Sequence, residues 1–396
     1  MGDKSVSCFF LYYYLVLCYS ITMRRTYKYG AKITRATEEA SIRWLSLCCT
    51  LYNTALEQRI DAYGRCGVSV TAVRQKNELP ALKATFPEYC TVGSQVLQDV
   101  IERLDRAYQG FFRRIRTGDI KAGFPRFKPL SRYDSFTLKQ AGWRLDGRYL
   151  YVTGLGRFKM YLSRPVAGDI KTVTVRRTAA GKWFVFFSCD NVPERDFPIT
   201  DASVGIDVGI KCFCVDSDNH SVANPKFLKQ GARLLRRRQR SLARKQRGSS
   251  NRGDARQLVA KAHETIQEQR RDFAHKAANH YILNYQEIYI EDLGIRNMVK
   301  NRRLSKSISD AAWGMFFDFL TYKAEEAGRQ VVKVNPRNTS QLCSRCGTLV
   351  PKTLSVRIHH CSSCGAVLDR DYNASLNIIA LGQRAQALTP ALADVA

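Results

Sequence analysis

Apolar and polar residues alternate with two different periods along the chain, which predicts strand-rich and helical regions. Residues 24–34 follow the two-residue period of a first strand. Apolar side chains then recur at helical spacing over 42–60 and again over 96–115. Thr37 is followed by two glutamates and has the character of a helix N-cap, so we expect the first helix to begin there.

Strand-like runs return between residues 149 and 189, where β-branched and aromatic side chains dominate. The small residues at 179–181 would close a hairpin between the last two of these runs. We infer a small β-barrel built from 23–35 and 121–200, into which a helical segment, 36–120, is inserted.

The rest of the chain alternates between short strands and helices. Residues 203–215 predict two strands joined by a tight turn, and a long basic helical stretch from 227 to 284 is interrupted at 248–253. The elements expected after it are a strand at 287–290, a helix at 311–327, a strand at 331–334 and a final helix at 374–381. This order predicts a multidomain fold of the α/β and α+β classes.

Both ends of the chain fall outside these patterns. The apolar run at 9–17 is too short to span a bilayer, has no basic region before it and is followed by no cleavage site. Met23 looks like a better natural start, so we expect residues 1–22 to be an upstream extension from a misassigned start codon, or a disordered tail. Residues 383–396 are expected to form a flexible tail.

The charge of the chain narrows the choice of partners. It has 63 Lys and Arg against 35 Asp and Glu, a formal net charge of +28, and a pI near 9.8. Such a surplus favours contact with a polyanion, usually a phosphodiester backbone, and no membrane partner is predicted. Thirteen cysteines, an odd number with no regular spacing outside two pairs, favour reduced thiols and a cytoplasmic, intracellular location.

Two Cys-x-x-Cys pairs near the C-terminus predict a metal site. Cys343 and Cys346 are followed, after 14 residues, by Cys361 and Cys364, and four thiolates at this spacing make the tetrahedral cage of a zinc ribbon. Four sulfur ligands leave no position open for water, so one Zn²⁺ would be structural here. The alternative is a set of spare reduced thiols. The adjacent histidines 359–360 are expected on the surface or in contact with nucleic acid.

Three acidic residues follow the ends of predicted elements. Asp207 and Glu291 each end a strand and Asp371 would open the last helix, which is the order found in an RNase H-like nuclease. Three carboxylates that converge on one sheet can hold two Mg²⁺ ions about 4 Å apart, an arrangement that hydrolyses phosphodiesters. Taken singly, each acid has a plainer interpretation as a turn residue, a strand end or a helix N-cap. Asp369 competes with Asp371 for the third place.

These residues carry a resemblance to a known family, the TnpB (OrfB) proteins of insertion sequences. Those proteins are compact relatives of type V CRISPR effectors and contain a RuvC-like nuclease. The resemblance covers about residues 24–382, is most specific from Ser203 onward, and does not predict the N-terminal extension. The matching segments are Gly205-Ile-Asp207-Val-Gly209, Ile288-Tyr-Ile-Glu291-Asp-Leu293, the two cysteine pairs, and Asp369-Arg-Asp371-Tyr-Asn373-Ala.

The resemblance implies an RNA-guided DNA endonuclease of a transposable element. Its guide RNA would come from the end of the element, and it would recognise a short motif beside a double-stranded DNA target. The resemblance matches Asp207, Glu291 and Asp371 to the three RuvC acids; we prefer Asp371 to Asp369 because its spacing to Asn373 fits the family pattern. The alternatives are a nuclease-inactive, RNA-guided DNA-binding regulator and a transposase accessory protein.

The resemblance also implies three parts. A β-barrel wedge domain would hold the guide RNA, and the helical insertion would contact the target. The RuvC-like nuclease domain would comprise 201–336 and 366–382, with the zinc ribbon, 337–365, inserted between them.

Dense basic segments are the expected nucleic-acid contacts. One lies in a helical stretch with almost no compensating acids, where each cation would neutralise a phosphate of a guide–target duplex; a solvated helix face is the alternative. A second mixes cations with Phe124 and Phe127, as a single-strand or RNA platform would, or packs those rings into a core. The residues are Arg126, Lys128, Arg233, Arg236, Arg237, Arg238, Arg240, Arg244, Lys245 and Arg247.

Overall fold

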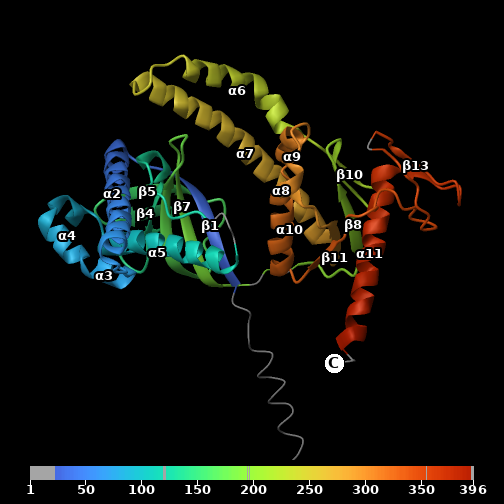
Figure 1. Ribbon diagram of the computed structural model, residues 1–396, viewed down its shortest axis with the longest axis horizontal. Helices are drawn as coiled ribbons and strands as arrows, with labels where there is room; N and C mark the ends of the chain where they lie inside the picture. Colours follow the sequence, from blue (N-terminus) through green and yellow to red (C-terminus); the bar gives the residue numbers. More distant parts are fainter. Residues whose placement is uncertain (1–22, 119–121, 194, 196, 354, 394–396) are drawn as a thin grey trace, which may run out of the picture. The chain divides into compact units, whose positions relative to one another are not determined.

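The structure is a computed structural model that describes residues 23–118, 122–193, 195, 197–353 and 355–393 (Figure 1). The chain divides into two compact units, the first ending at Pro193 and the second beginning at Glu194. The prediction for residues 1–22 lies outside the described residues. None of the helices in the described part of the chain is both long enough and apolar enough to cross a membrane.

The first unit is built on a seven-stranded antiparallel sheet that forms a nearly closed barrel. Its strand order is β2-β6-β7-β1-β5-β4-β3. The strands are β1 (Met23–Lys32), β2 (Ser135–Leu138), β3 (Trp143–Asp146), β4 (Tyr149–Val152), β5 (Gly156–Tyr161), β6 (Asp169–Arg177) and β7 (Trp183–Val192).

The two-residue period of the sequence decides which face of this sheet is buried. In β1, Tyr27 and Tyr29 are buried, and they lie opposite Phe187 and Val185 of β7, which are also buried. The hairpin predicted between the last two strand-like runs is confirmed, because β6 and β7 pair antiparallel. Gly181 adopts a φ of 82° in this turn, a conformation that glycine reaches without strain.

Helices pack on this sheet and share its core. They are α2 (Arg35–Cys66), α3 (Ala72–Asn77), α4 (Leu79–Thr85), η1 (Pro87–Thr91), α5 (Ser94–Arg116) and η2 (Leu130–Arg132). The predicted helix start at Thr37 is wrong, because Thr34 is the N-cap and its side chain accepts from the Thr37 amide at 3.2 Å. Thr34 has the extended backbone of a cap residue, whereas Thr37 lies buried in the first turn.

The second unit contains a mixed five-stranded sheet of order β10-β9-β8-β11-β12. Strands β8, β11 and β12 are parallel, while β9 and β10 pair antiparallel. The strands are β8 (Ser203–Val208), β9 (Cys212–Asp216), β10 (Ser221–Ala223), β11 (Glu287–Glu291) and β12 (Gln330–Val334), and a separate hairpin is formed by β13 (Ile358–His360) and β14 (Val367–Asp369).

Helices cover both faces of the five-stranded sheet, as Figure 1 shows. One face packs Ile206 and Ile290 with side chains of α7 and α10, and the other packs Tyr289 with Ile378 of α11. The helices of this unit are α6 (Phe227–Ala243), α7 (Ser250–Asn284), α8 (Ile295–Met298), α9 (Ser305–Ala311), α10 (Trp313–Glu326) and α11 (Arg370–Ala393).

Two predicted boundaries in this unit differ from the structure. The break in the basic helical stretch was predicted at 248–253, but α7 already begins at Ser250, because Ser249 caps it by accepting from the Arg252 amide. Helix α11 continues over residues 383–393, where we expected a flexible tail. This extension begins with good helix formers, and Gln386 accepts a hydrogen bond from the hydroxyl of Tyr289.

Candidate active site and cysteine cage

Asp207 and Glu291 lie beside each other at the carboxyl ends of two neighbouring parallel strands. Strand β8 pairs with β11 in a register that places Ile206 opposite Ile290, so the acids follow this pair directly. Side chains alternate between faces along a strand. Because Ile206 and Ile290 face α7 and α10, both acids point to the face that α11 covers.

Helix α11 approaches that face unusually closely, which brings its first turn to the acids. A Cβ atom on Gly205 would lie 2.3 Å from the carbonyl oxygen of Ser375 and 2.8 Å from the amide nitrogen of Ile379. Only glycine leaves room for the helix backbone at this position. The Oδ2 atom of Asp371 lies 4.0 Å from the ideal Cβ position at Gly209, just beyond the end of β8.

The two aspartates of the Asp-Arg-Asp motif have different positions. Asp369 caps α11, because its Oδ1 accepts from the amides of Asp371 and Tyr372 at 2.8 and 3.3 Å. Asp371 lies inside the helix, near Asp207. Its Oδ1 accepts from Nε and Nη2 of Arg370 at 3.0 and 2.8 Å, and Nη1 of Arg357 lies 3.7 Å from Oδ2.

We call Asp207, Glu291 and Asp371 the carboxylate cluster. Burial raises the pKa of Asp207 well above its ordinary value, and the nearby charges of Glu291 and Asp371 raise it further, against the opposing effect of Arg370. Burial also raises the pKa of Glu291, against the hydrogen bond from Thr339. Charged carboxylates held together in this way are stabilised by added positive charge, which a bound cation supplies.

The carboxylate cluster is wider than the ligand shell of a single ion. Among the described residues, the groups of three or more candidate ligands whose atoms all lie within 4.8 Å are the four cysteines and a separate set on β9, its following turn and α7. The carboxylate cluster is not one of them. Its donors are all oxygens, the atoms that hard divalent cations prefer.

Cys343, Cys346, Cys361 and Cys364 come together, and we call them the cysteine cage. Their Sγ atoms all lie within 4.8 Å of one another, with 3.6 Å between Cys343 and Cys364 and 3.6 Å between Cys346 and Cys361. Zn–S bonds of about 2.3 Å place the sulfur atoms of a tetrahedron about 3.8 Å apart. The donor set and its spacing therefore fit Zn²⁺.

The two Cys-x-x-Cys pairs form the same local structure twice. In the first, the Cys343 amide donates to Thr348 O at 2.9 Å, and the Gly347 amide donates back to Cys343 O at 2.9 Å. In the second, Cys361 and Gly365 make the equivalent bonds at 2.9 and 3.0 Å. Both glycines have φ near 70°, at 74° and 70°, so each knuckle depends on a left-handed residue after its second cysteine.

Side chains of α11 connect the cysteine cage to the carboxylate cluster. Asn373 donates to Leu342 O at 2.7 Å and accepts from the Ser344 amide at 3.0 Å, beside the first cysteine. Asn377 donates to Thr339 O at 2.8 Å, and the Thr339 hydroxyl donates to Oε1 of Glu291 at 2.5 Å. Sequence reasoning did not single out Thr339 or Asn377. The available signal for Asn377 was its spacing of one helical turn from Asn373.

His359 is not on the surface, so that part of the expectation for residues 359–360 is wrong. It is fully buried, while His360 is exposed. Strand alternation in β13 turns the first of these side chains inward. Burial lowers the pKa of His359, and Lys352, whose Nζ contacts its Nδ1, lowers it further.

The predicted nucleic-acid contacts fall into two groups. In α6 and the turn after it, all eight cations lie on the surface, with Arg238 the least exposed, and within the described part of the chain none of them forms an ion pair with an acid. In the other segment, Arg126 is exposed, but Lys128 packs its ammonium 4.2 Å from the ring centre of Tyr52. Phe124 meets Tyr108 edge-on at 5.5 Å while remaining 44% exposed.

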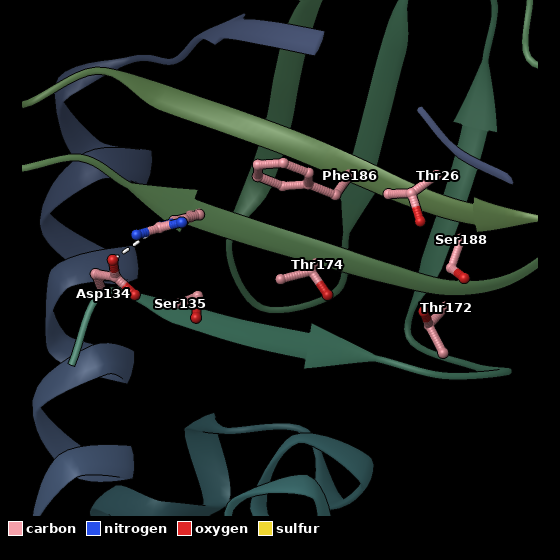
Figure 2. A pocket seen from close by; sticks show the side chains of 8 residues that line it. Thr26, Asp134, Ser135, Thr172, Thr174, Phe186 and Ser188 are labelled. Carbon is pink, nitrogen blue, oxygen red and sulfur yellow. Dashed lines mark hydrogen bonds and ion pairs between the residues drawn. The ribbon is translucent and has the colours of Figure 1, made fainter. Parts of the chain in front are cut away.

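The outward face of the first unit's sheet carries a polar hollow of about 490 Å³. Figure 2 shows the hydroxyls of Thr26, Thr172, Thr174 and Ser188 lining it, with Phe186 beside them. Asp134 accepts from Arg176 at 2.7 Å at its rim. Sequence reasoning did not single out this surface.

The fold and the two sites define a mixed α/β protein whose second unit carries both a carboxylate cluster and a cysteine cage. Residues 186–302 match the family model OrfB_IS605, described as "Probable transposase", and residues 313–378 match the Cas12f1-like TNB domain. The chain is also similar in fold to the protein in "Cryo-EM structure of the Cas12f1-sgRNA-target DNA complex", with a TM-score of 0.56, 14% identity, and coverage of 90% of this chain and 98% of that one.

Two relatives match most of the chain. It is 34% identical over 374 residues to "Putative RNA-guided DNA endonuclease" of Streptomyces pristinaespiralis, which covers 92% of this chain and 91% of the relative. It is 32% identical to "Putative RNA-guided DNA endonuclease InsQ" of Escherichia coli (strain K12), over 73% of this chain and 74% of the relative. The chain therefore belongs to the TnpB (OrfB) family.

Proposed function

We propose that this protein is an RNA-guided DNA endonuclease of a transposable element, which cleaves its target next to a short flanking motif. The observation that carries the proposal is the carboxylate cluster, in which acids from β8, β11 and α11 share one face of a sheet. Relatives named as RNA-guided DNA endonucleases, matched over most of their length, support the same activity.

In this proposal the second unit is a RuvC-like domain of the RNase H class. Asp207, Glu291 and Asp371 would hold two Mg²⁺ ions, which, when bound, supply an activated water and stabilise the leaving oxygen of the phosphodiester. Arg370 holds Oδ1 of Asp371, and Oδ2, which Nη1 of Arg357 faces at 3.7 Å, is the oxygen that would bind a cation. Thr339 fixes the orientation of Glu291.

The cysteine cage would hold one structural Zn²⁺ in a ribbon inserted before α11. Four sulfur donors complete a tetrahedron and leave no position for substrate. The hydrogen bonds of Asn373, Asn377 and Thr339 would transmit the order of the ribbon to Glu291. We therefore assign the ribbon a supporting role in catalysis.

The partners in this proposal are a guide RNA from the mobile element and double-stranded target DNA. The cations of α6 have no competing acids within ion-pair distance in the described structure, so they are free to neutralise phosphates along a duplex. The hydroxyl-lined hollow of the first unit suits sugar and phosphate oxygens of the guide. Complementarity to the guide, rather than protein side chains, would read most of the target sequence.

The deciding experiment is plasmid cleavage by the full chain with co-expressed guide RNA. Asp207→Ala and Glu291→Ala should each reduce cleavage by at least about 100-fold, because loss of an outer-shell partner of a metal already costs 10–100-fold. RNA binding should change little. Asp292→Ala is the matched control, since this exposed acid follows Glu291 directly.

The same experiment separates the remaining alternatives. Cleavage that survives Asp207→Ala or Glu291→Ala would contradict the assignment of the carboxylate cluster. A wild-type protein that binds guide and target without cutting would be a DNA-binding regulator. Asp371→Ala and Asp369→Ala distinguish the two aspartates, because loss of Asp371 should abolish cleavage, whereas loss of the Asp369 cap should cost about 1 kcal/mol of stability.

A further inference from the structure

A second set of metal-type ligands lies in the same unit, away from both sites described above. Asp216 ends β9, His220 lies four residues later in the turn before β10, and His280 lies near the end of α7. One ligand atom from each residue lies within 4.8 Å of the others. Sequence reasoning did not find this group, because 60 residues separate its two histidines.

This group lies on the opposite face of the sheet from the carboxylate cluster. Asp216 is paired across strands with Ile206, and directly opposed residues in an antiparallel pair point to the same side. Ile206 packs against α7 and α10, whereas Asp207, the next residue, points toward α11. A hydrogen bond from Tyr281 of α7 to Oδ2 of Asp216, at 3.2 Å, agrees with this placement.

Asp216 is a buried and fixed carboxylate beneath two more accessible imidazoles. Its side chain has no exposed surface, whereas that of His220 is 54% exposed. Its Oδ1 accepts from the amides of Asp218 and His220 at 3.2 and 2.8 Å. Its Oδ2 lies 3.4 Å from Nδ1 of His220. Oδ2, which also accepts from the Tyr281 hydroxyl at 3.2 Å, is therefore the oxygen that lies beside an imidazole.

The plainer explanation accounts for only part of this arrangement. Asp216 orders the turn and His220 lies beside it. His280 has Asn284 as a neighbour, with Nδ2 3.4 Å from its Nδ1, and among the described residues no acid lies within ion-pair distance of it. The two rings nevertheless lie with centroids 5.1 Å apart and planes tilted by 37°. Two imidazoles beside one carboxylate form a ligand set suited to first-row divalent metals, with positions left for water.

We propose that Asp216, His220 and His280 bind a first-row divalent cation such as Zn²⁺. The ion joins the turn before β10 to the last turns of α7, and it steadies β9, which pairs with the strand that carries Asp207. Its role is structural. The ligands face away from the carboxylate cluster, so the ion takes no part in the proposed nuclease chemistry.

The test is an equilibrium titration of the full chain with Zn²⁺ by calorimetry, comparing the wild-type protein with His220→Gln and His280→Gln. Each variant should bind one ion fewer, or bind it at least about tenfold more weakly, because even an outer-shell partner contributes that much. His263→Gln is the matched control, since His263 is an exposed histidine of α7, the helix that carries His280. This variant should bind Zn²⁺ as the wild type does.

The design isolates this site because the cysteine cage and the carboxylate cluster are unchanged in every variant. Added Zn²⁺ should also raise the melting temperature of the wild type and of His263→Gln, and raise it less in the other two variants. Equal stoichiometry and equal affinity in all four proteins would overturn the proposal. So would loss of binding in His263→Gln alone.

Discussion

The cysteine cage and the carboxylate cluster lie at the two ends of one short hydrogen-bonded path, yet they are built in opposite ways. The cage consists of two copies of one local structure, each with its own amide bonds and left-handed glycine. The carboxylate cluster draws one acid from each of three elements, and the acids lie 84 and 80 positions apart along the chain. A set of sulfur donors can thus be encoded locally, whereas this set of carboxylate donors depends on how a sheet and a helix pack.

The largest effect should follow from breaking the cage. Cys361→Ser removes a buried sulfur ligand, and structural zinc sites contribute on the order of 10 kcal/mol to the folding of their domains. We expect the zinc content to fall by one ion per chain and cleavage to be lost with it. Atomic emission and protease sensitivity of the ribbon measure this. Cys66→Ser, at an exposed cysteine outside the cage, should leave both unchanged.

Gly205→Ala tests the packing on which the carboxylate cluster depends. The new methyl group would overlap the backbone of α11 at Ser375 and Ile379, and overpacking of this kind costs about 1–3 kcal/mol. Chemical denaturation should show this loss, together with reduced cleavage. Gly253→Ala, at a helical glycine with open space around it, should stabilise the protein slightly. Equal stability of the two variants would show that α11 does not lie as close to β8 as described.

Thr339→Val tests the path between the two sites. Its hydroxyl lowers the pKa of Glu291, which burial raises, so the variant should hold a proton on Glu291 to higher pH. Cleavage should then require a higher pH and roughly 10–100-fold more Mg²⁺. Thr339→Ser retains the hydroxyl and should restore the wild-type dependence. If the valine and serine variants have the same pH profile, Thr339 is not a positioning residue.

Asp207→Asn should have the smallest effect on stability, and its sign is diagnostic. Burial and the neighbouring acids raise the pKa of Asp207, so the folded state binds this proton more tightly than the unfolded state does. Metal-free protein therefore loses stability as pH rises from the ordinary range of an aspartate toward the raised pKa. The asparagine variant should melt higher than the wild type at neutral pH in magnesium-free buffer. A lower melting temperature would contradict the crowding of charges in the carboxylate cluster.

Strands β8, β9, β11 and β12 of the second unit and the grouping of the four cysteines could be predicted from the chain because their signals are local, whereas β10, β13 and β14 were not predicted. The pair of strands at 203–215 alternates within a few residues, and the two cysteine pairs have the spacing of complete knuckles. Predicted element ends were less accurate. The cap at Thr34 depends on a hydrogen bond between its side chain and the Thr37 amide, and the extension of α11 includes a hydrogen bond between Gln386 and Tyr289. Neither bond is evident from the sequence pattern.

The residue types of each site can be read from the chain alone, and sulfur and carboxylate donors differ in the class of metal that they favour. The arrangement of the sites depends on the tertiary fold. It gave Asp369 and Asp371 different positions, connected Thr339 to Glu291, and brought His220 and His280 together on the far side of the sheet. Strand pairing and close helix packing bring together residues that lie far apart along the chain, and no local pattern in the sequence shows which of them will be in contact.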